Sequence, residues 1–323
     1  MTPEPSCHDM SKARAAPAEW PWWLVTATYF AASCLMHLQF SLWLVRPRDL
    51  PWGRHALSEL VPAAAAVGAL VLAVVVIRQL RRRPRPWILG SAWLLWALAV
   101  FAIDRFLTYS ASEYFHYPQY ALLAWLIART LDPQRRRWIP GRVLFWTTLL
   151  SAADELLQYL WITASYSHYF DFNDVLVNFV AGVAGVLIYY GLMAKPIASG
   201  AYRRPLALET SISVIATLLV AGGLASGRLQ LSPTVSLPPG GLTQDSQGRW
   251  TLYLQRSPGQ HGSWQSGPHR GLHYVLRPSE ALLGLAVAAV LIVGVGRRAN
   301  LCQQAGRGDA AATISPSSAV KSR

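Results

Sequence analysis

Residues 143–162 read VLFWTTLLSAADELLQYLWI, an apolar stretch of the length that crosses a bilayer. Its second half holds two acids and an amide, Asp154, Glu155 and Gln158. Such groups cost several kcal/mol in hydrocarbon unless they face partners or water. The stretch therefore predicts a membrane helix whose polar side contacts other polar groups, and that contact is the main indication of function.

The composition of the whole chain supports a membrane protein. Of its 323 residues, 53% are hydrophobic and only 14% are charged, whereas soluble domains carry about 25% charged residues. Several apolar runs of about 20 residues match the thickness of a hydrocarbon core. The runs are continuous and do not alternate, which argues against a membrane β-barrel. We expect an all-α polytopic membrane helical bundle.

Eight spans are predicted, with boundaries uncertain by two to four residues. They cover about residues 22–45, 58–77, 87–107, 115–131, 143–162, 175–193, 208–225 and 281–295. The corresponding division of the chain is a leader with two spans (1–86), a four-span core (87–195), a seventh span (196–226), an exported Pro/Gly-rich insert (227–279), an eighth span (280–300) and a disordered cytoplasmic tail (301–323).

The insert shows alternation at residues 250–255 and 273–276, which predicts two strands and a small β-hairpin. Three histidines of the insert are interpreted as scattered loop residues, because no acid or cysteine completes a ligand set with them. They are His261, His269 and His273.

The net charge of +13 is concentrated in short loops rather than on one face. Arginines cluster within residues 78–85 and 129–142, and such loops stay on the cytoplasmic side of a membrane. This predicts a multi-pass protein of the bacterial cytoplasmic membrane with both termini in the cytoplasm. It also argues against a nucleic-acid partner.

Three consecutive predicted spans carry polar or small residues at helical spacing, which places them on one face of each helix. The two glycines of the third set would let another helix approach closely. The sets are Glu113, His116 and Tyr120; then Ser151, Asp154 and Gln158 with Glu155 beside them; and then Asp174, Asn178, Gly182 and Gly185.

These sets, in this order, resemble the VanZ-like family of integral membrane proteins. HYPQYALL at residues 116–123 is similar to its H-[FY]-x-x-Y-x-x-L element, and DELLQ at 154–158 to its D-E-x-x-Q element. DVLVNFVAGVAG at 174–185 is similar to its D-v-l-x-N…G…G element. The resemblance covers about residues 87–193. One departure is His168, where the family usually has an arginine.

The resemblance implies a role in the cell envelope, because the namesake of the family is associated with low-level resistance to teicoplanin. It assigns no reaction and no catalytic residue. The alternatives considered are binding of a polar lipid or lipid-linked glycan head group in an outer-half cavity, a membrane-embedded enzyme acting on a lipid-linked substrate, and a proton-coupled transporter. Of these, head-group binding is favoured.

The oligomeric state is left open, and no cofactor and no resident metal are expected. A divalent cation on Asp154, Glu155, Asp174 and His116 is considered only within the enzyme alternative. The predicted ligand-binding residues are Glu113, His116, Tyr120, Asp154, Glu155, Gln158, His168, Asp174 and Asn178, with Gly182 and Gly185 for helix packing.

Overall fold

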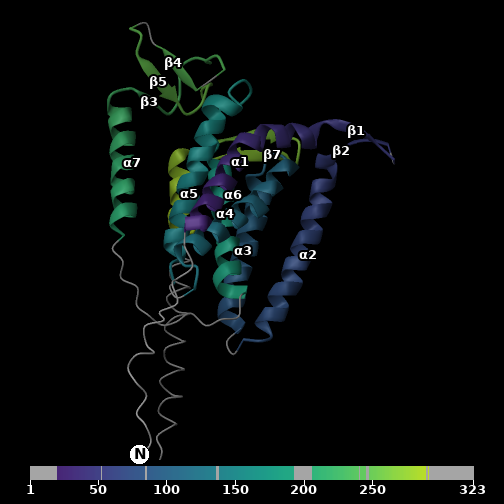
Figure 1. Cartoon of the computed structure of the whole chain (residues 1–323). Coiled ribbons are helices and arrows are strands. Elements are labelled where there is room, and N and C mark those ends of the chain that lie inside the picture. Colours follow the sequence, from purple (N-terminus) through teal and green to yellow (C-terminus); the bar gives the residue numbers. More distant parts are fainter. Residues whose placement is uncertain are drawn as a thin grey trace, which may run out of the picture.

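The structure is a computed structural model that describes residues 20–51, 53–83, 86–135, 138–192, 206–239, 241–244, 247–288 and 290. The predictions for the leader before residue 20, the tail from residue 301 and the second half of the eighth span lie outside these residues. The described part is a helical bundle with a small β-rich region at one end (Figure 1). The predicted mostly helical class is confirmed.

The helices follow the predicted apolar runs closely. They are α1 (Trp20–Val45), α2 (Val61–Leu80), α3 (Pro86–Phe106), α4 (His116–Leu131), α5 (Pro140–Leu157), α6 (Phe172–Val186) and α7 (Ala207–Ala225). Two single 3₁₀ turns precede α2 and α4, and π-helical turns extend α5 to Ile162 and α6 to Leu192. A short apolar helix, Pro278–Ala288, follows the insert.

Four helices in the described residues are long and apolar enough to cross a membrane: Leu57–Leu80, Pro86–Phe106, Phe172–Leu192 and Ala207–Ala225. The eight predicted spans are therefore supported only in part. The 16 residues of α4 reach about 24 Å at 1.5 Å per residue, which is shorter than a hydrocarbon core of about 30 Å. Helix α5 carries the acidic pair Asp154 and Glu155 in its last turn.

Helix α6 is the central element of the bundle. Of its apolar span 72% is buried, against 11% for the span containing α2 and 6% for α7. It packs most extensively against α4 and then α5. A Cβ at Gly185 would lie 2.2 Å from the Ala121 carbonyl oxygen of α4, so only glycine permits this approach. Gly182 faces α5 in the same way, with Thr147 Cγ2 3.0 Å away.

The outer helices keep large apolar side chains on their surfaces. Leu70 of α2 is 66% exposed and Leu219 of α7 is 70% exposed, and in Figure 1 these helices stand on opposite sides of the bundle. Continuous apolar faces of this kind suit contact with lipid. A bidentate ion pair between Arg142 of α5 and Glu209 of α7 connects these helices. In it, Arg142 Nη2 lies 2.9 Å from Glu209 Oε2.

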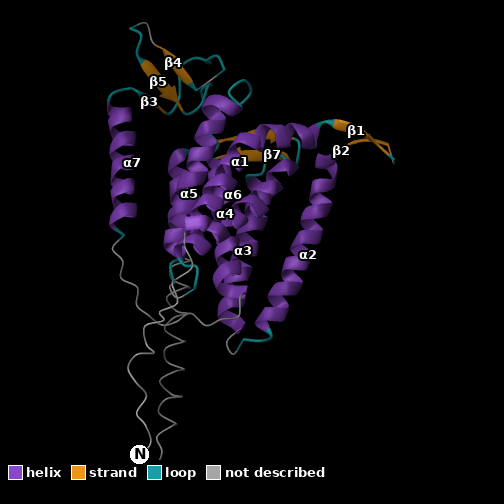
Figure 2. Cartoon of the chain, in the orientation of Figure 1, coloured by secondary structure: helices purple, strands orange, loops and turns teal. Residues whose placement is uncertain are grey.

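In the part of the chain that the structure describes, the strands form three small sheets (Figure 2). An antiparallel hairpin that was not predicted, β1 (Pro47–Leu50) with β2 (Gly53–Ala56), joins α1 to α2. The insert holds β3 (Leu229–Gln230), β4 (Leu242–Gln244) and β5 (Trp250–Tyr253) in the order β3-β5-β4, and the antiparallel pair β6 (Ser263–Gly267) and β7 (Gly271–Val275). The two predicted strands correspond to β5 and β7, which belong to different sheets and do not pair with each other.

Replacing Gly185 with alanine is expected to destabilise the bundle, because the new Cβ would overlap the Ala121 carbonyl and force α4 and α6 apart. Overpacking of this kind costs about 1–3 kcal/mol. Gly68 of α2 is the matched control, since nothing lies within 4 Å of a Cβ there. Thermal unfolding in detergent should show a lower midpoint for Gly185→Ala than for Gly68→Ala. Equal midpoints would contradict the close packing of α4 on α6.

Candidate functional site

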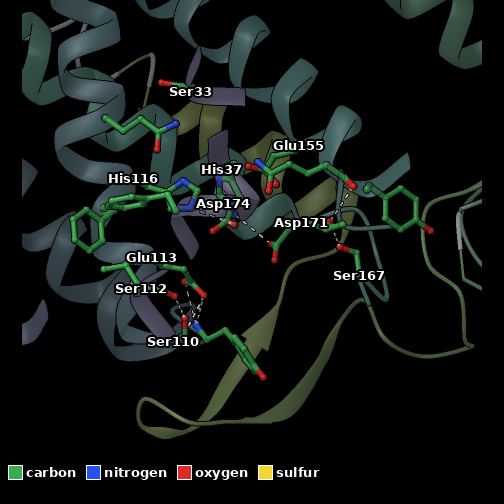
Figure 3. Close-up of a pocket in the computed structure, with 18 of the residues that line it drawn as sticks. Ser33, His37, Ser110, Ser112, Glu113, His116, Glu155, Ser167, Asp171 and Asp174 are labelled. Carbon is green, nitrogen blue, oxygen red and sulfur yellow. Dashed lines mark hydrogen bonds and ion pairs between the residues drawn. The ribbon is translucent and has the colours of Figure 1, made fainter. Parts of the chain in front are cut away.

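A cavity of about 1030 Å³ lies where the ends of several helices meet the insert. Helix α1, the segment around the start of α4, the end of α5 and the loop into α6 supply most of its lining. The hairpin β6–β7 adds Gln265, Ser266 and His273. Figure 3 shows the polar side chains that point into it.

A chain of buried hydrogen bonds joins the three core helices behind this cavity. Asn178 of α6 donates from Nδ2 to Ser151 Oγ of α5 (2.9 Å). With the amide held in this orientation, Asn178 Oδ1 accepts from His116 Nδ1 at the start of α4 (2.8 Å). Because Nδ1 then carries the imidazole proton, the lone pair of a neutral His116 is on Nε2.

Three ionisable groups meet on the cavity side of this chain. His116, Glu155 and Asp174 each place a nitrogen or oxygen atom within 4.8 Å of the others, and they face one another in Figure 3. His116 Nε2 lies 3.8 Å from Asp174 Oδ2. Glu155 Oε1 and Asp174 Oδ1 are buried and have no hydrogen-bond partner. The sequence placed these residues on three different helices, and the structure brings them into one cluster.

The other predicted residues divide into two groups. Glu113, Gln158 and His168 also line the cavity, and Gln158 Nε2 is buried without a partner. Tyr120, Asp154 and Asn178 are not among the lining residues. Tyr120 donates to Asp154 Oδ2 (2.7 Å), and Asp154 is fully buried beside Cys34 of α1. These three residues lie within the bundle, next to the residues that line the cavity.

Two carboxyls at the rim of the cavity act as helix caps. Asp171 accepts hydrogen bonds from the backbone N–H groups of Asn173 (2.9 Å) and Asp174 (3.3 Å), and so caps the start of α6. Glu113 accepts from the N–H groups of Tyr109 and Ser110. Burial, with the nearby Asp174 charge, raises the pKa of Asp171 to about 8. Burial also raises the pKa of Glu113 well above its usual range.

Helix α1 forms one wall of the cavity, although none of its residues was among the predicted ligand-binding residues. Tyr29, Ser33 and His37 line the cavity, and the His37 ring lies 5.8 Å from the His116 ring. These residues are four apart on a helix, so they share one face. That polar spacing in an apolar helix was a usable signal, although it lies outside the family resemblance.

The insert covers the site more closely than the interpretation of its histidines as scattered loop residues implied. His273 is 2% exposed, lines the cavity and packs on Tyr109. His261 bonds to the Phe170 carbonyl (3.0 Å). His269 lies 2.9 Å from Asp104 Oδ1. No local sequence pattern indicates the positions of these histidines, because their partners are distant in the sequence.

Asp104 and Arg105 are neighbours in the sequence but have different partners in the structure. Asp104 binds Arg270 and His269 of the insert, whereas the Arg105 guanidinium lies over Phe106. Asn173 further fixes the insert, since it donates to the Tyr274 carbonyl (2.7 Å) and accepts from Leu276 N (3.0 Å). These contacts hold the insert against the ends of α3 and α6.

The charge of the lining restricts the chemistry of the site. Four carboxyls line the cavity, and the lining residues in the described part of the chain include no lysine or arginine. Unpartnered carboxylate oxygens accept hydrogen bonds from hydroxyl or amine groups and also coordinate cations. The arrangement can therefore bind a hydroxylated or positively charged group. The carboxyls are Glu113, Glu155, Asp171 and Asp174.

Comparison with known proteins agrees with the motifs. The model of the VanZ/LLP1 family matches residues 69–194. The match begins within α2, earlier than the resemblance seen in the sequence, and ends at almost the same residue. Searches of the curated proteins and of the solved structures found no match. Residues 69–194 thus match the VanZ/LLP1 family, and the matched segment includes His116, Glu155 and Asp174.

Proposed function

We propose that the chain binds the polar head group of a membrane lipid or lipid-linked glycan precursor in this cavity. The observation that carries the proposal is the set of buried polar atoms without partners, Glu155 Oε1, Asp174 Oδ1 and Gln158 Nε2, around a cavity of about 1030 Å³. Buried polar groups that the protein leaves unpaired cost free energy unless a ligand or water satisfies them. A head group would supply the missing contacts.

The apolar part of the lining favours an amphiphilic ligand. Met36 and Phe40 of α1 and Leu122 of α4 line the cavity and are 62%, 41% and 44% exposed. They continue the apolar surface of a helical membrane protein, where an acyl chain can lie. A lipid would place its chain along these residues and its head group against the acids, so both halves of the molecule would be accommodated.

The acidic lining favours particular head groups. Sugar hydroxyls and amines donate hydrogen bonds to carboxylates, whereas a bare phosphate would be repelled by the surrounding acids. A glycan or amine-bearing head group therefore fits the lining best. A phosphate group would need a cation beside the carboxylates.

The site also suggests a second candidate, an enzyme acting on a lipid-linked substrate. The specific observation is the proximity of His116 to Glu155 and Asp174, a combination that can transfer protons. Turnover of a bound lipid by the purified protein would support this candidate, and binding without turnover would support the first.

Filling the cavity from α1 should weaken lipid binding. Ala32 lines the cavity, and its neighbour Ala31 is exposed but does not line it. Tryptophan at position 32 would occupy the space of the ligand, and a loss of about 1.4 kcal/mol lowers the binding constant about tenfold. Native mass spectrometry of protein purified from bacterial membranes should show bound lipid in the wild type and much less in Ala32→Trp.

Ala31→Trp is the matched control, because it adds the same side chain to the same helix outside the cavity. It should retain the lipid. Equal lipid occupancy in the wild type and in Ala32→Trp would contradict binding in this cavity.

A role in glycopeptide tolerance gives a cellular prediction. Expression in a sensitive bacterium should slightly raise the teicoplanin concentration that stops growth, and Asn178→Ala should remove the rise. The substitution deletes two buried hydrogen bonds that hold His116 and Ser151, which costs about 1–3 kcal/mol for the groups left unpaired.

Ser91→Ala on the exposed face of α3 is the control for expression, since Ser91 bonds only to its own helix. Immunoblots of the membrane fraction compare protein levels. A wild-type protein that leaves teicoplanin susceptibility unchanged would contradict the resistance part of the proposal without affecting the lipid-binding part.

A further inference from the structure

We propose that His116, Glu155 and Asp174 hold a divalent transition-metal cation, with Zn²⁺ as the best fit. One imidazole and two carboxylates form a mixed nitrogen and oxygen ligand set, which suits zinc or manganese. From the sequence no resident metal is expected. The structure changes that expectation because it brings ligands from α4, α5 and α6 to one point.

The distances suit ligands of a common ion better than direct bonds between the side chains. The ligand atoms all lie within 4.8 Å of one another. His116 Nε2 and Asp174 Oδ2 are 3.8 Å apart, which is too long for a hydrogen bond. Two tetrahedral ligands at about 2.1 Å from a zinc ion lie about 3.4 Å apart. Small side-chain shifts would therefore close the site around an ion.

The imidazole of His116 is already oriented for a metal. Its Nδ1 donates to Asn178 Oδ1 (2.8 Å), and the Asn178 amide is fixed by Ser151 (2.9 Å). Metal-bound histidines usually donate their other ring N–H to such an acceptor, which fixes the tautomer and the ring plane. The lone pair on Nε2 is thus directed at Glu155 and Asp174, as Figure 3 shows for the side chains.

A second, independent observation comes from the unpartnered carboxylate oxygens. Glu155 is 4% exposed, and its Oε1 has no hydrogen-bond partner. Asp174 Oδ1 is likewise buried and unpartnered. Two adjacent carboxylates with buried oxygen atoms repel each other and lose hydration, and among the described residues no lysine or arginine lines the cavity. A bound cation would both neutralise the pair and satisfy these oxygens.

Three protein ligands would leave one position of a four-coordinate zinc ion open, and all three residues line the cavity. A phosphate or hydroxyl oxygen of a head group could take that position, so the cation would let an acidic cavity accept a phosphate-bearing lipid. This extension rests on the proposed function. Zinc binding itself does not, because it can be measured without added lipid.

Zinc binding by the full-length protein tests the inference. Protein in detergent, stripped with a chelator and titrated with Zn²⁺ alone, should bind one equivalent per chain by calorimetry and metal analysis. Glu155→Gln and Asp174→Asn should each lower the affinity at least a hundredfold. Asn178→Ala, which releases the His116 ring, should lower it about 10–100-fold.

Glu113→Gln is the matched control. Glu113 lines the same cavity but its carboxyl group accepts hydrogen bonds from backbone N–H groups, and glutamine preserves such a cap while removing the same ionisable group. This variant should bind zinc like the wild type. An equal loss in Glu113→Gln and Glu155→Gln would show a general charge effect and overturn the site.

Further outcomes are also decisive. No zinc uptake by the wild type, or unchanged affinity in Glu155→Gln, would overturn the site. Absorption of bound Co²⁺ in the visible range should report inner-sphere ligands and should be lost in Asp174→Asn, while thermal unfolding verifies that each variant is folded. Ala32→Trp should keep zinc while losing lipid, so failure of the metal site and failure of lipid binding give different results.

Discussion

The close approach of α6 to α4 and α5 is the constraint on which the site depends. Gly185 lets α6 contact the backbone of α4, and Gly182 lets it contact Thr147 of α5. This packing brings Asn178 between His116 and Ser151, so one amide ties three helices together. A bulkier α6 would separate these helices, and the side chains on the cavity side would no longer meet.

The position of the acids explains how a membrane protein tolerates them. Asp154 is satisfied in part by Tyr120 within the bundle, whereas Glu155, one residue later, turns toward the cavity. The π-helical turn that begins at Gln158 follows directly, and turns of this kind occur often at functional sites. The cost of burying Glu155 and Asp174 is thereby concentrated where a ligand or cation can offset it.

Helical spacing in the sequence predicted which residues share a polar helix face. It could not predict which other segments surround the cavity. Helical spacing predicted a polar face with Asp174 and Asn178 and another with Asp154, with Glu155 beside it. In the structure Glu155 and Asp174 line the cavity, whereas Asp154 and Asn178 do not. The count of eight spans was supported only in part, since four helices among the described residues are long and apolar enough to cross a membrane, and α4 has only 16 residues. His273 reaches the cavity through tertiary packing that no local pattern encodes, whereas His37 lies on the polar face of α1 that helical spacing could have indicated.

An experimental density map of the protein, purified with zinc and bacterial lipid, tests the central claim most directly. We expect His116, Glu155 and Asp174 to surround one cavity. Anomalous scattering should identify zinc between them, and a lipid head group should lie beside the ion. A map in which the polar edges of α5 and α6 face different surroundings would contradict the shared site and, with it, both proposals.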